Sequence, residues 1–148
     1  MARTCFMFGH RNVGEDIFPA LEEAIERHYT QHGVRNFIVG RYGSFDRLAR
    51  AAIAAAKGRH DDIRAALLIP YYPVDGALDL PRDFDDSLYP QGLETTPPRL
   101  AIIKANELMV KAADTVICCV NHPGNAAHLL EMALRQQDKR LLIVENIE

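Results

Sequence analysis

Residues 115–131, TVICCVNHPGNAAHLLE, contain the signals that decide the fold. An apolar, β-branched run ends at Asn121, and a Pro-Gly turn then leads into residues with helical spacing of apolar side chains. A strand that is apolar along its whole length is typical of one covered on both faces, as in parallel sheets. This segment therefore predicts a buried parallel strand followed by a helix.

The rest of the chain repeats this alternation of strand and helix. Similar apolar runs predict strands at 4–8, 36–39, 64–69 and 141–144, in addition to 115–120. Helical spacing predicts four helices: about Gly14 to His32, ended by Gly33; 45–56, ended by Gly58; one opened by Pro97 and Pro98 and reaching Ala112; and 126–134, with Leu134 on its apolar stripe.

Strands that alternate with helices predict an α/β fold: one Rossmann-like domain of three layers spanning residues 1–148. We expect a five-stranded parallel sheet with helices on both faces. With the strands numbered in chain order, the expected order is 3-2-1-4-5, so the switch point lies between the strands at 4–8 and 115–120.

A long segment, 71–98, interrupts the alternation after the third strand. It has five prolines and six acidic residues. Loops of this length inside compact domains are often functional lids, although a disordered surface insertion is the alternative. The rings of Tyr71, Tyr72, Phe84 and Tyr89 favour an ordered loop, because aromatic side chains need a packing partner.

Composition limits the classes of function. The chain has 148 residues, a formal net charge of −3 and three cysteines. The negative charge makes nucleic acid an unfavourable partner, and no apolar run is long enough to span a bilayer. Cys5, Cys118 and Cys119 all fall in expected strands, so we expect no disulfide framework and a reducing, cytoplasmic compartment. The first residues read as a strand rather than as a signal peptide.

Ligands of open α/β sheets bind beyond the carboxyl ends of the strands, at the switch point. The start of the third helix is expected at the same edge. The candidate ligand-binding residues are therefore Gly9, His10, Arg11, Gly40, Arg41, Gly43, Ser44, Asp46, Arg99, Asn106, Asn121, His122, Gly124, Asn125 and Glu131.

Three of these loops contain glycine and open a helix, an arrangement that suits phosphate. Ser44 is either a plain helix N-cap or a phosphate contact. Arg11, Arg41, Arg99 and Lys104 either converge on phosphate or are solvated surface cations. Neither a G-x-G-x-x-G sequence after the first strand nor a Walker lysine motif is present, which disfavours dinucleotide dehydrogenases and P-loop enzymes.

His10, His122 and His128 are expected near Asp46 and Glu131 at this edge. No two of these histidines have a recognised zinc spacing, so we expect no metal and interpret them as hydrogen-bond donors to a base or sugar, or as exposed side chains. Glu131 is either ordinary surface, a ribose contact, or a carboxylate that stabilises cationic character at C1′ of a sugar.

Several phrases resemble the SLOG (Smf/DprA–LOG) superfamily of Rossmann-like nucleotide-binding proteins, and its YpsA-like branch in particular. They are FGHRN after the first strand, VGRYGSFDRLA after the second, and YPQGLETTPPR before the third helix. The LOG phosphoribohydrolases of this superfamily, which resemble lysine decarboxylases, carry PGG-x-GT-x-x-E. Gly124 and Glu131 match its first glycine and its glutamate, whereas Asn125, Ala127 and His128 replace the remaining glycines and threonine.

The resemblance implies a protein that senses or processes a nucleotide or nucleotide-derived sugar phosphate, with no required cofactor and with a homodimer or higher homo-oligomer as partner. It also implies an alternative, a nucleoside 5′-monophosphate phosphoribohydrolase that uses Glu131 and Arg99 as catalytic residues. A further alternative is an interaction module with a vestigial pocket.

Overall fold

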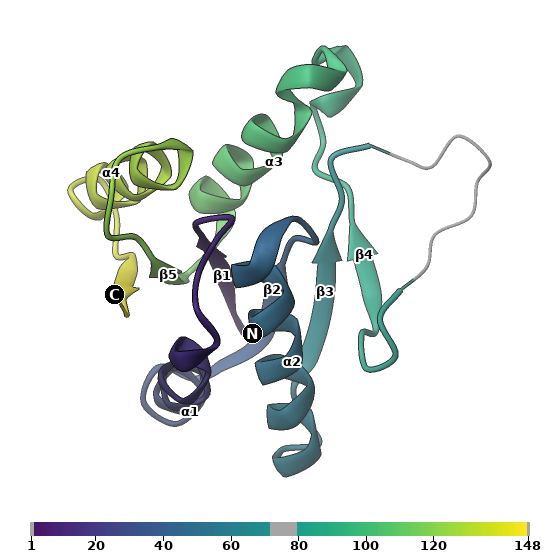
Figure 1. Ribbon diagram of the computed structural model, residues 1–148, viewed down its shortest axis with the longest axis vertical. Coiled ribbons are helices and arrows are strands. Elements are labelled where there is room, and N and C mark those ends of the chain that lie inside the picture. The colour runs from purple at the N-terminus through teal and green to yellow at the C-terminus, as the bar shows by residue number, and fades with distance from the viewer. Residues whose placement is uncertain (1, 72–79, 148) are drawn as a thin grey trace.

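The computed structural model describes residues 2–71 and 80–147. Its strands form one parallel sheet with helices on both faces, the α/β architecture that the sequence predicts (Figure 1). The sheet has six strands in the order β4-β3-β2-β1-β5-β6. The strands are β1 (Arg3–Gly9), β2 (Val34–Val39), β3 (Arg64–Leu68), β4 (Asp86–Leu88), β5 (Thr115–Cys119) and β6 (Ile143–Asn146).

The expected number of five strands is wrong, because β4 lies inside the segment interpreted as a long loop. It pairs in parallel with β3, with Ala66 opposite Asp86 and Leu68 opposite Leu88. The Asp85 carboxylate accepts hydrogen bonds from the Ala65 amide at 2.8 Å and from Lys57 at 2.6 Å. Strand β4 has only three residues, too few to show the periodic spacing of apolar side chains from which strands are predicted. The other five strands keep the expected order relative to one another.

The described part of segment 71–98 has further structure besides β4. It contains a 3₁₀ helix, η2 (Leu93–Thr95), and Phe84 is buried. The hydroxyl of Tyr71 lies 3.3 Å from that of Tyr42. Tyr72 and the rest of 72–79 lie outside the described residues, whereas 80–98 of the segment expected as a possible lid is described.

In the described residues the strands are connected by four α-helices: α1 (Phe18–His32), α2 (Gly43–Arg59), α3 (Pro98–Ala112) and α4 (Asn125–Gln137). The 3₁₀ helix η1 (Glu15–Ile17) precedes α1. Gly33 ends α1 in the left-handed conformation, as predicted. Two expectations are wrong. Gly58 lies inside α2, which continues to Arg59, and Leu134 is 46% exposed because it lies beyond the edge of the buried stripe formed by Leu129 and Ala133.

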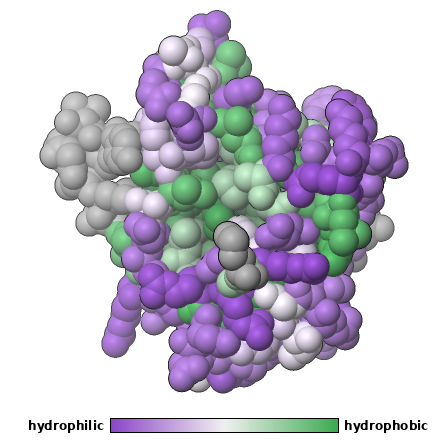
Figure 2. Space-filling model, turned by 180° about the vertical axis from the view of Figure 1, so that it is seen from behind, coloured by the Kyte–Doolittle hydropathy of each residue, from purple (hydrophilic) through white to green (hydrophobic). Residues whose placement is uncertain are grey.

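Two hydrophobic clusters define the layers. One face of the sheet packs against α1 and α2 through residues such as Leu21, Phe37 and Phe45, and the other packs against α3 and α4 through residues such as Phe8 and Met109. Figure 2 shows the side of the molecule opposite to that in Figure 1, where hydrophobic side chains gather in a hollow framed by hydrophilic ones. Within the described residues, no helix has the length and apolar character needed to cross a membrane.

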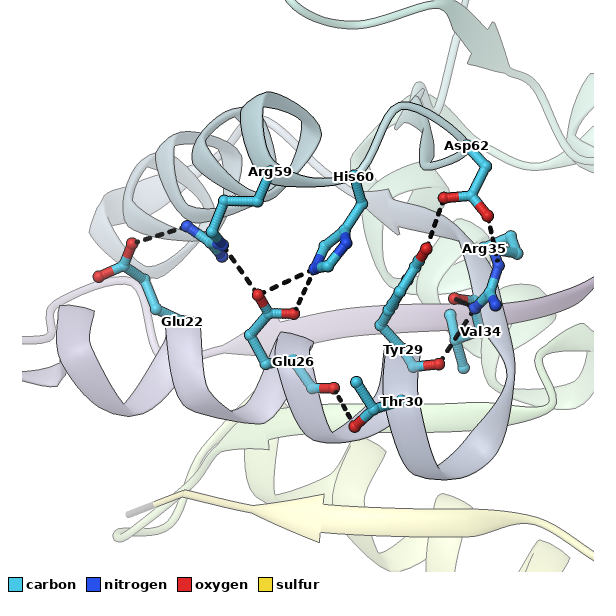
Figure 3. A network of polar contacts seen from close by, with 9 residues as sticks. All are labelled: Glu22, Glu26, Tyr29, Thr30, Val34, Arg35, Arg59, His60 and Asp62. Carbon is cyan, nitrogen blue, oxygen red and sulfur yellow. Dashed lines mark hydrogen bonds and ion pairs between the residues drawn. The ribbon is translucent and has the colours of Figure 1, made fainter.

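A polar network fixes the end of α2 against α1 (Figure 3). The Glu26 carboxylate on α1 accepts hydrogen bonds from Arg59 at 2.8 Å and His60 at 2.8 Å. Beside it, the Tyr29 hydroxyl donates to Asp62 at 2.6 Å, and the Arg35 guanidinium lies 3.9 Å from the Tyr29 ring centroid. The contacts of Glu26 hold the carboxyl end of α2 against α1.

Candidate functional site

A cavity of about 960 Å³ lies at the carboxyl edge of the sheet, where the topology predicts a ligand. Its walls come from the ends of β1 and β3, the first turn of α2, and one side each of α3 and α4. Of the predicted ligand-binding residues, those that line it are Gly9, His10, Arg11, Gly40, Asp46, Arg99, Asn106, His122, Gly124, Asn125 and Glu131. His128 lines it as well.

Four predicted residues, Arg41, Gly43, Ser44 and Asn121, are not among the residues that line the cavity, and neither is Lys104. Arg41 is exposed, with its guanidinium 5.8 Å from the Tyr42 ring centroid. The other three, Gly43, Ser44 and Asn121, contact the segment that follows β1 and so support the cavity wall.

Ser44 holds the loop after β1 in place. Its hydroxyl donates to the Arg11 carbonyl at 2.8 Å and accepts from the Val13 amide at 2.7 Å. Its own amide donates to the same Arg11 carbonyl at 2.7 Å. Both donors of Ser44 are therefore used within the chain and are not left for a phosphate. The residue is also not an N-cap, because α2 already begins at Gly43.

Gly43 has a specific reason to be glycine. Its φ angle is 91°, a left-handed conformation, and a Cβ at this position would lie 2.8 Å from the Arg11 Cα. The close approach of the two backbones brings the start of α2 against the loop of His10 and Arg11. Gly43 thus shapes the wall of the cavity instead of binding a ligand directly.

His10 presents a hydrogen-bond donor with a defined tautomer. Its ring is buried and stacks on that of His122, with 3.5 Å between centroids. Its Nε2 accepts the Asn121 amide hydrogen at 3.1 Å, so the neutral ring carries its proton on Nδ1. Burial, followed by the neighbouring His122, lowers the pKa of His10, which keeps the ring neutral at pH 7.

The Nδ1 atom of His10 is available to a ligand. It has no hydrogen-bond partner within residues 2–71 and 80–147, and in that part of the chain no side-chain nitrogen or oxygen is both buried and unpaired. Nδ1 is therefore accessible, and His10 lines the cavity. An N–H group held in this way favours an acceptor such as a phosphate, carbonyl or hydroxyl oxygen.

The start of α4 supplies further donors. Gly124 precedes the helix with φ 143°, and no side chain caps it. The first amide bonded within the helix is that of His128, which donates to the Gly124 carbonyl at 3.1 Å. The amides of Asn125, Ala126 and Ala127 precede it and have no intrahelical acceptor. Together with the positive end of the helix dipole, they form a position for an anion at the cavity.

Charged side chains of both signs line the same space. Arg11 and Arg99 are exposed cations on the cavity wall. Glu131 is an exposed carboxylate whose nearest cation is Arg135, at 3.6 Å and four residues along α4. The hydrolase alternative requires an arginine within reach of Glu131. Within the described residues neither Arg41 nor Arg99 forms an ion pair with it, whereas Arg135, on the same helix face, does.

Asp46 is the most perturbed carboxylate at the site. It lies in the first turn of α2, and its Oδ2 accepts the Tyr42 amide hydrogen at 3.0 Å. Burial raises its pKa to about 6, against the opposing effects of the Tyr42 hydrogen bond and the Arg50 and Arg11 charges. A carboxylate with a perturbed pKa in a cavity is a typical feature of functional sites.

Sequence reasoning missed several residues of the cavity wall: Tyr42, Leu68, Pro70, Ile102, Ile103, Glu107 and Arg135. Arg135 was accessible to a sequence argument, because it follows Glu131 by four residues on a predicted helix. The apolar members belong to the end of β3 and to α3, and they become wall residues only through the tertiary arrangement.

Within the described residues, no group of three or more histidine, cysteine or acidic side chains is placed to hold a metal ion. His10 and His122 stack face to face, an arrangement in which their ring nitrogens do not converge on one point.

Comparison with protein-family models finds no match for this chain, and comparison with curated proteins finds none either.

Proposed function

We propose that this protein binds a nucleotide or a nucleotide-derived sugar phosphate at the carboxyl edge of its sheet, as a sensor or processor of that ligand. The observation that carries the proposal is the uncapped start of α4, whose free amides open into a cavity also lined by Arg11, Arg99 and the Nδ1 donor of His10. The resemblance to the SLOG superfamily points to the same class of ligand.

The phosphate would sit against the amides of Asn125, Ala126 and Ala127, where N–H groups and the helix dipole favour negative charge. Arg99 and Arg11 would supply charge-assisted hydrogen bonds. The apolar side chains of Leu68, Pro70 and Ile102 offer a surface for a base. The volume of about 960 Å³ lies at the upper end of the range for small-molecule sites, so it suits a ligand larger than phosphate alone.

A thermal-shift screen tests this proposal. The panel contains AMP, GMP, CMP, UMP, ADP-ribose, UDP-glucose and inorganic phosphate. A ligand present at ~100 times its Kd adds about 2.7 kcal/mol of stability, which raises Tm by roughly 5–10 °C for a chain of this length. Arg99→Ala should abolish most of the shift, whereas Arg64→Ala, at the opposite edge of the sheet, should leave it unchanged. No shift with any organic phosphate contradicts the proposal.

A second candidate function is hydrolysis of the N-glycosidic bond of a nucleoside 5′-monophosphate. It is favoured by one observation: Glu131 and Arg99 line the same cavity. Chromatographic detection of free base from the same nucleotides, lost in Glu131→Gln, would establish it. Nucleotide binding without release of base would exclude it and leave the binding function in place.

A homo-oligomer in the cytoplasm, with no required metal or cofactor, completes the proposal. Within residues 51–56 of α2, Ala52, Ile53 and Ala56 are fully buried in the chain's own core, whereas Ala51 is exposed and Ala54 and Ala55 are half-buried. Light scattering of the purified protein measures its mass directly, and a monomer would exclude this part of the proposal.

A further inference from the structure

Among the described residues, three carboxylates line the cavity, those of Asp46, Glu107 and Glu131. Asp46 and Glu131 differ in their exposure and in their partners. Glu131 is exposed, with 61% of its side-chain surface accessible, and is paired with Arg135. Asp46 is partly buried in the first turn of α2, and its printed hydrogen bond comes from a backbone group, the Tyr42 amide. An exposed, paired carboxylate discriminates weakly between ligands, whereas a desolvated one with an unused oxygen discriminates strongly.

The two oxygens of Asp46 have different roles. Oδ2 accepts the Tyr42 amide hydrogen and lies so close to Gly40 that a Cβ there would be 2.9 Å away. Oδ1 has no partner within the described chain. In residues 2–71 and 80–147, every side-chain oxygen without a hydrogen-bond partner is accessible to solvent, so Oδ1 is accessible. Asp46 also lines the cavity. One oxygen therefore fixes the carboxylate and the other is free for a ligand.

The position of Asp46 relative to the proposed phosphate site follows from strand order. Asp46 follows β2, and the start of α4 follows β5, while β1 lies between these two strands. Neighbouring strands are about 4.8 Å apart, so the ends of β2 and β5 are separated by roughly 10 Å. This separation leaves room for a ribose phosphate, with its sugar beside Asp46 and its phosphate at the start of α4.

The chemistry of a carboxylate selects what it binds. An ionised carboxylate accepts hydrogen bonds and donates none, so it requires N–H or O–H groups on the ligand. In a ribose phosphate the sugar hydroxyls are such donors. Dinucleotide-binding Rossmann folds use an acidic residue for this role, and Asp46 is an acidic residue further along the chain than the end of β2, in the first turn of α2. A ligand that lacks the hydroxyl would leave Oδ1 desolvated and unpaired, which costs binding free energy.

Resting on the proposed nucleotide-binding function, we propose that Asp46 reads a ribose hydroxyl through its free Oδ1, so that the cavity selects ribonucleotides over deoxyribonucleotides. A hydrogen bond to a charged group gives a preference of about 10- to 100-fold. Glu131 does not contribute to this choice, because it is exposed and paired with Arg135.

The test is calorimetric titration with AMP, 2′-deoxy-AMP and 3′-deoxy-AMP, repeated with the GMP, CMP and UMP series. For the wild type, loss of one hydroxyl should weaken binding about 10- to 100-fold. In Asp46→Ala the ribonucleotide should fall to the affinity of the deoxynucleotide, so that the preference disappears. Asp61→Asn, an exposed aspartate outside the cavity, should keep the full preference. Circular dichroism confirms that each variant is folded.

The outcomes separate this inference from the function on which it rests. Equal affinity for ribonucleotides and both deoxynucleotides overturns the role of Asp46 while nucleotide binding stands. A preference that persists in Asp46→Ala also overturns it, because another group then reads the hydroxyl. Failure of every nucleotide to bind the wild type overturns the proposed function and this inference with it.

Discussion

Replacement of Asp46 by asparagine should stabilise the protein at neutral pH. Asparagine keeps an oxygen that accepts the Tyr42 amide hydrogen but carries no charge. In the folded wild type, burial raises the pKa of Asp46 to about 6 from an ordinary value of 3.8. The ionised carboxylate is therefore destabilising in the folded chain.

The sign and size of the effect follow from linkage. Below pH 3.8 the carboxyl is protonated in both the folded and unfolded states, and it contributes no penalty. As pH rises, the unfolded chain ionises first, and the penalty is complete above pH 6. The difference of roughly two pKa units at 1.36 kcal/mol each corresponds to about 3 kcal/mol. About 2 kcal/mol of this lies between pH ~4.5 and ~7.5.

Urea unfolding followed by circular dichroism across this pH range measures the effect. The free energy of unfolding of Asp46→Asn minus that of the wild type should rise by about 2 kcal/mol from pH ~4.5 to ~7.5. Asp85→Asn is the matched control, and its difference from the wild type should stay nearly constant over this range and change only below pH ~4, where the wild-type carboxylate becomes protonated. Burial alone would raise the pKa of Asp85, but hydrogen bonds from Lys57 and the Ala65 amide outweigh it and lower the pKa. A flat difference for Asp46→Asn would refute the reasoning.

Three further predictions concern the frame of the site. Gly9→Ala places a Cβ 2.5 Å from the fully buried Phe45 ring and should lower the free energy of unfolding in urea by about 1–3 kcal/mol. Gly58→Ala is the control: its Cβ would have no neighbouring atom within 4 Å, so the free energy of unfolding should rise by about 0.5–1 kcal/mol. Equal effects of the two substitutions would contradict this prediction. Ser44→Ala leaves the Val13 amide without its acceptor and should cost about 1–3 kcal/mol, whereas an unchanged stability would show that the Ser44 contacts are dispensable. Glu26→Gln should lower Tm at pH 7 and less at pH ~4, because hydrogen bonds from Arg59 and His60 outweigh burial and lower the Glu26 pKa; a pH-independent effect would argue against it.

The strand order and the edge that carries the cavity followed from the sequence because both depend on long apolar periods. The runs at 4–8 and 115–120 are each covered on two faces, and their position next to each other was expected from the strand order of Rossmann-like folds. Strand β4 gave no such signal. It is three residues long, and its place depends on backbone pairing with β3 and on the contacts of Asp85.

The role of individual site residues was less predictable. Ser44 and Gly43 follow a strand and open a helix, a pattern shared by phosphate-binding residues and by residues that only shape a loop. The distinction depends on the Arg11 backbone, which approaches from a distant part of the sequence. The stack of His10 on His122 is of the same kind, because it joins two loops more than 100 residues apart.

The most direct test of the central claim is a titration of ¹⁵N-labelled protein with AMP, GMP, CMP and UMP in turn, followed by amide chemical shifts. The account predicts that at least one nucleotide shifts the amides of Asn125, Ala126 and Ala127, together with those of Gly9 to Arg11, along one saturating curve. Perturbations confined to other surfaces, or none up to millimolar nucleotide, would contradict a phosphate site at the start of α4.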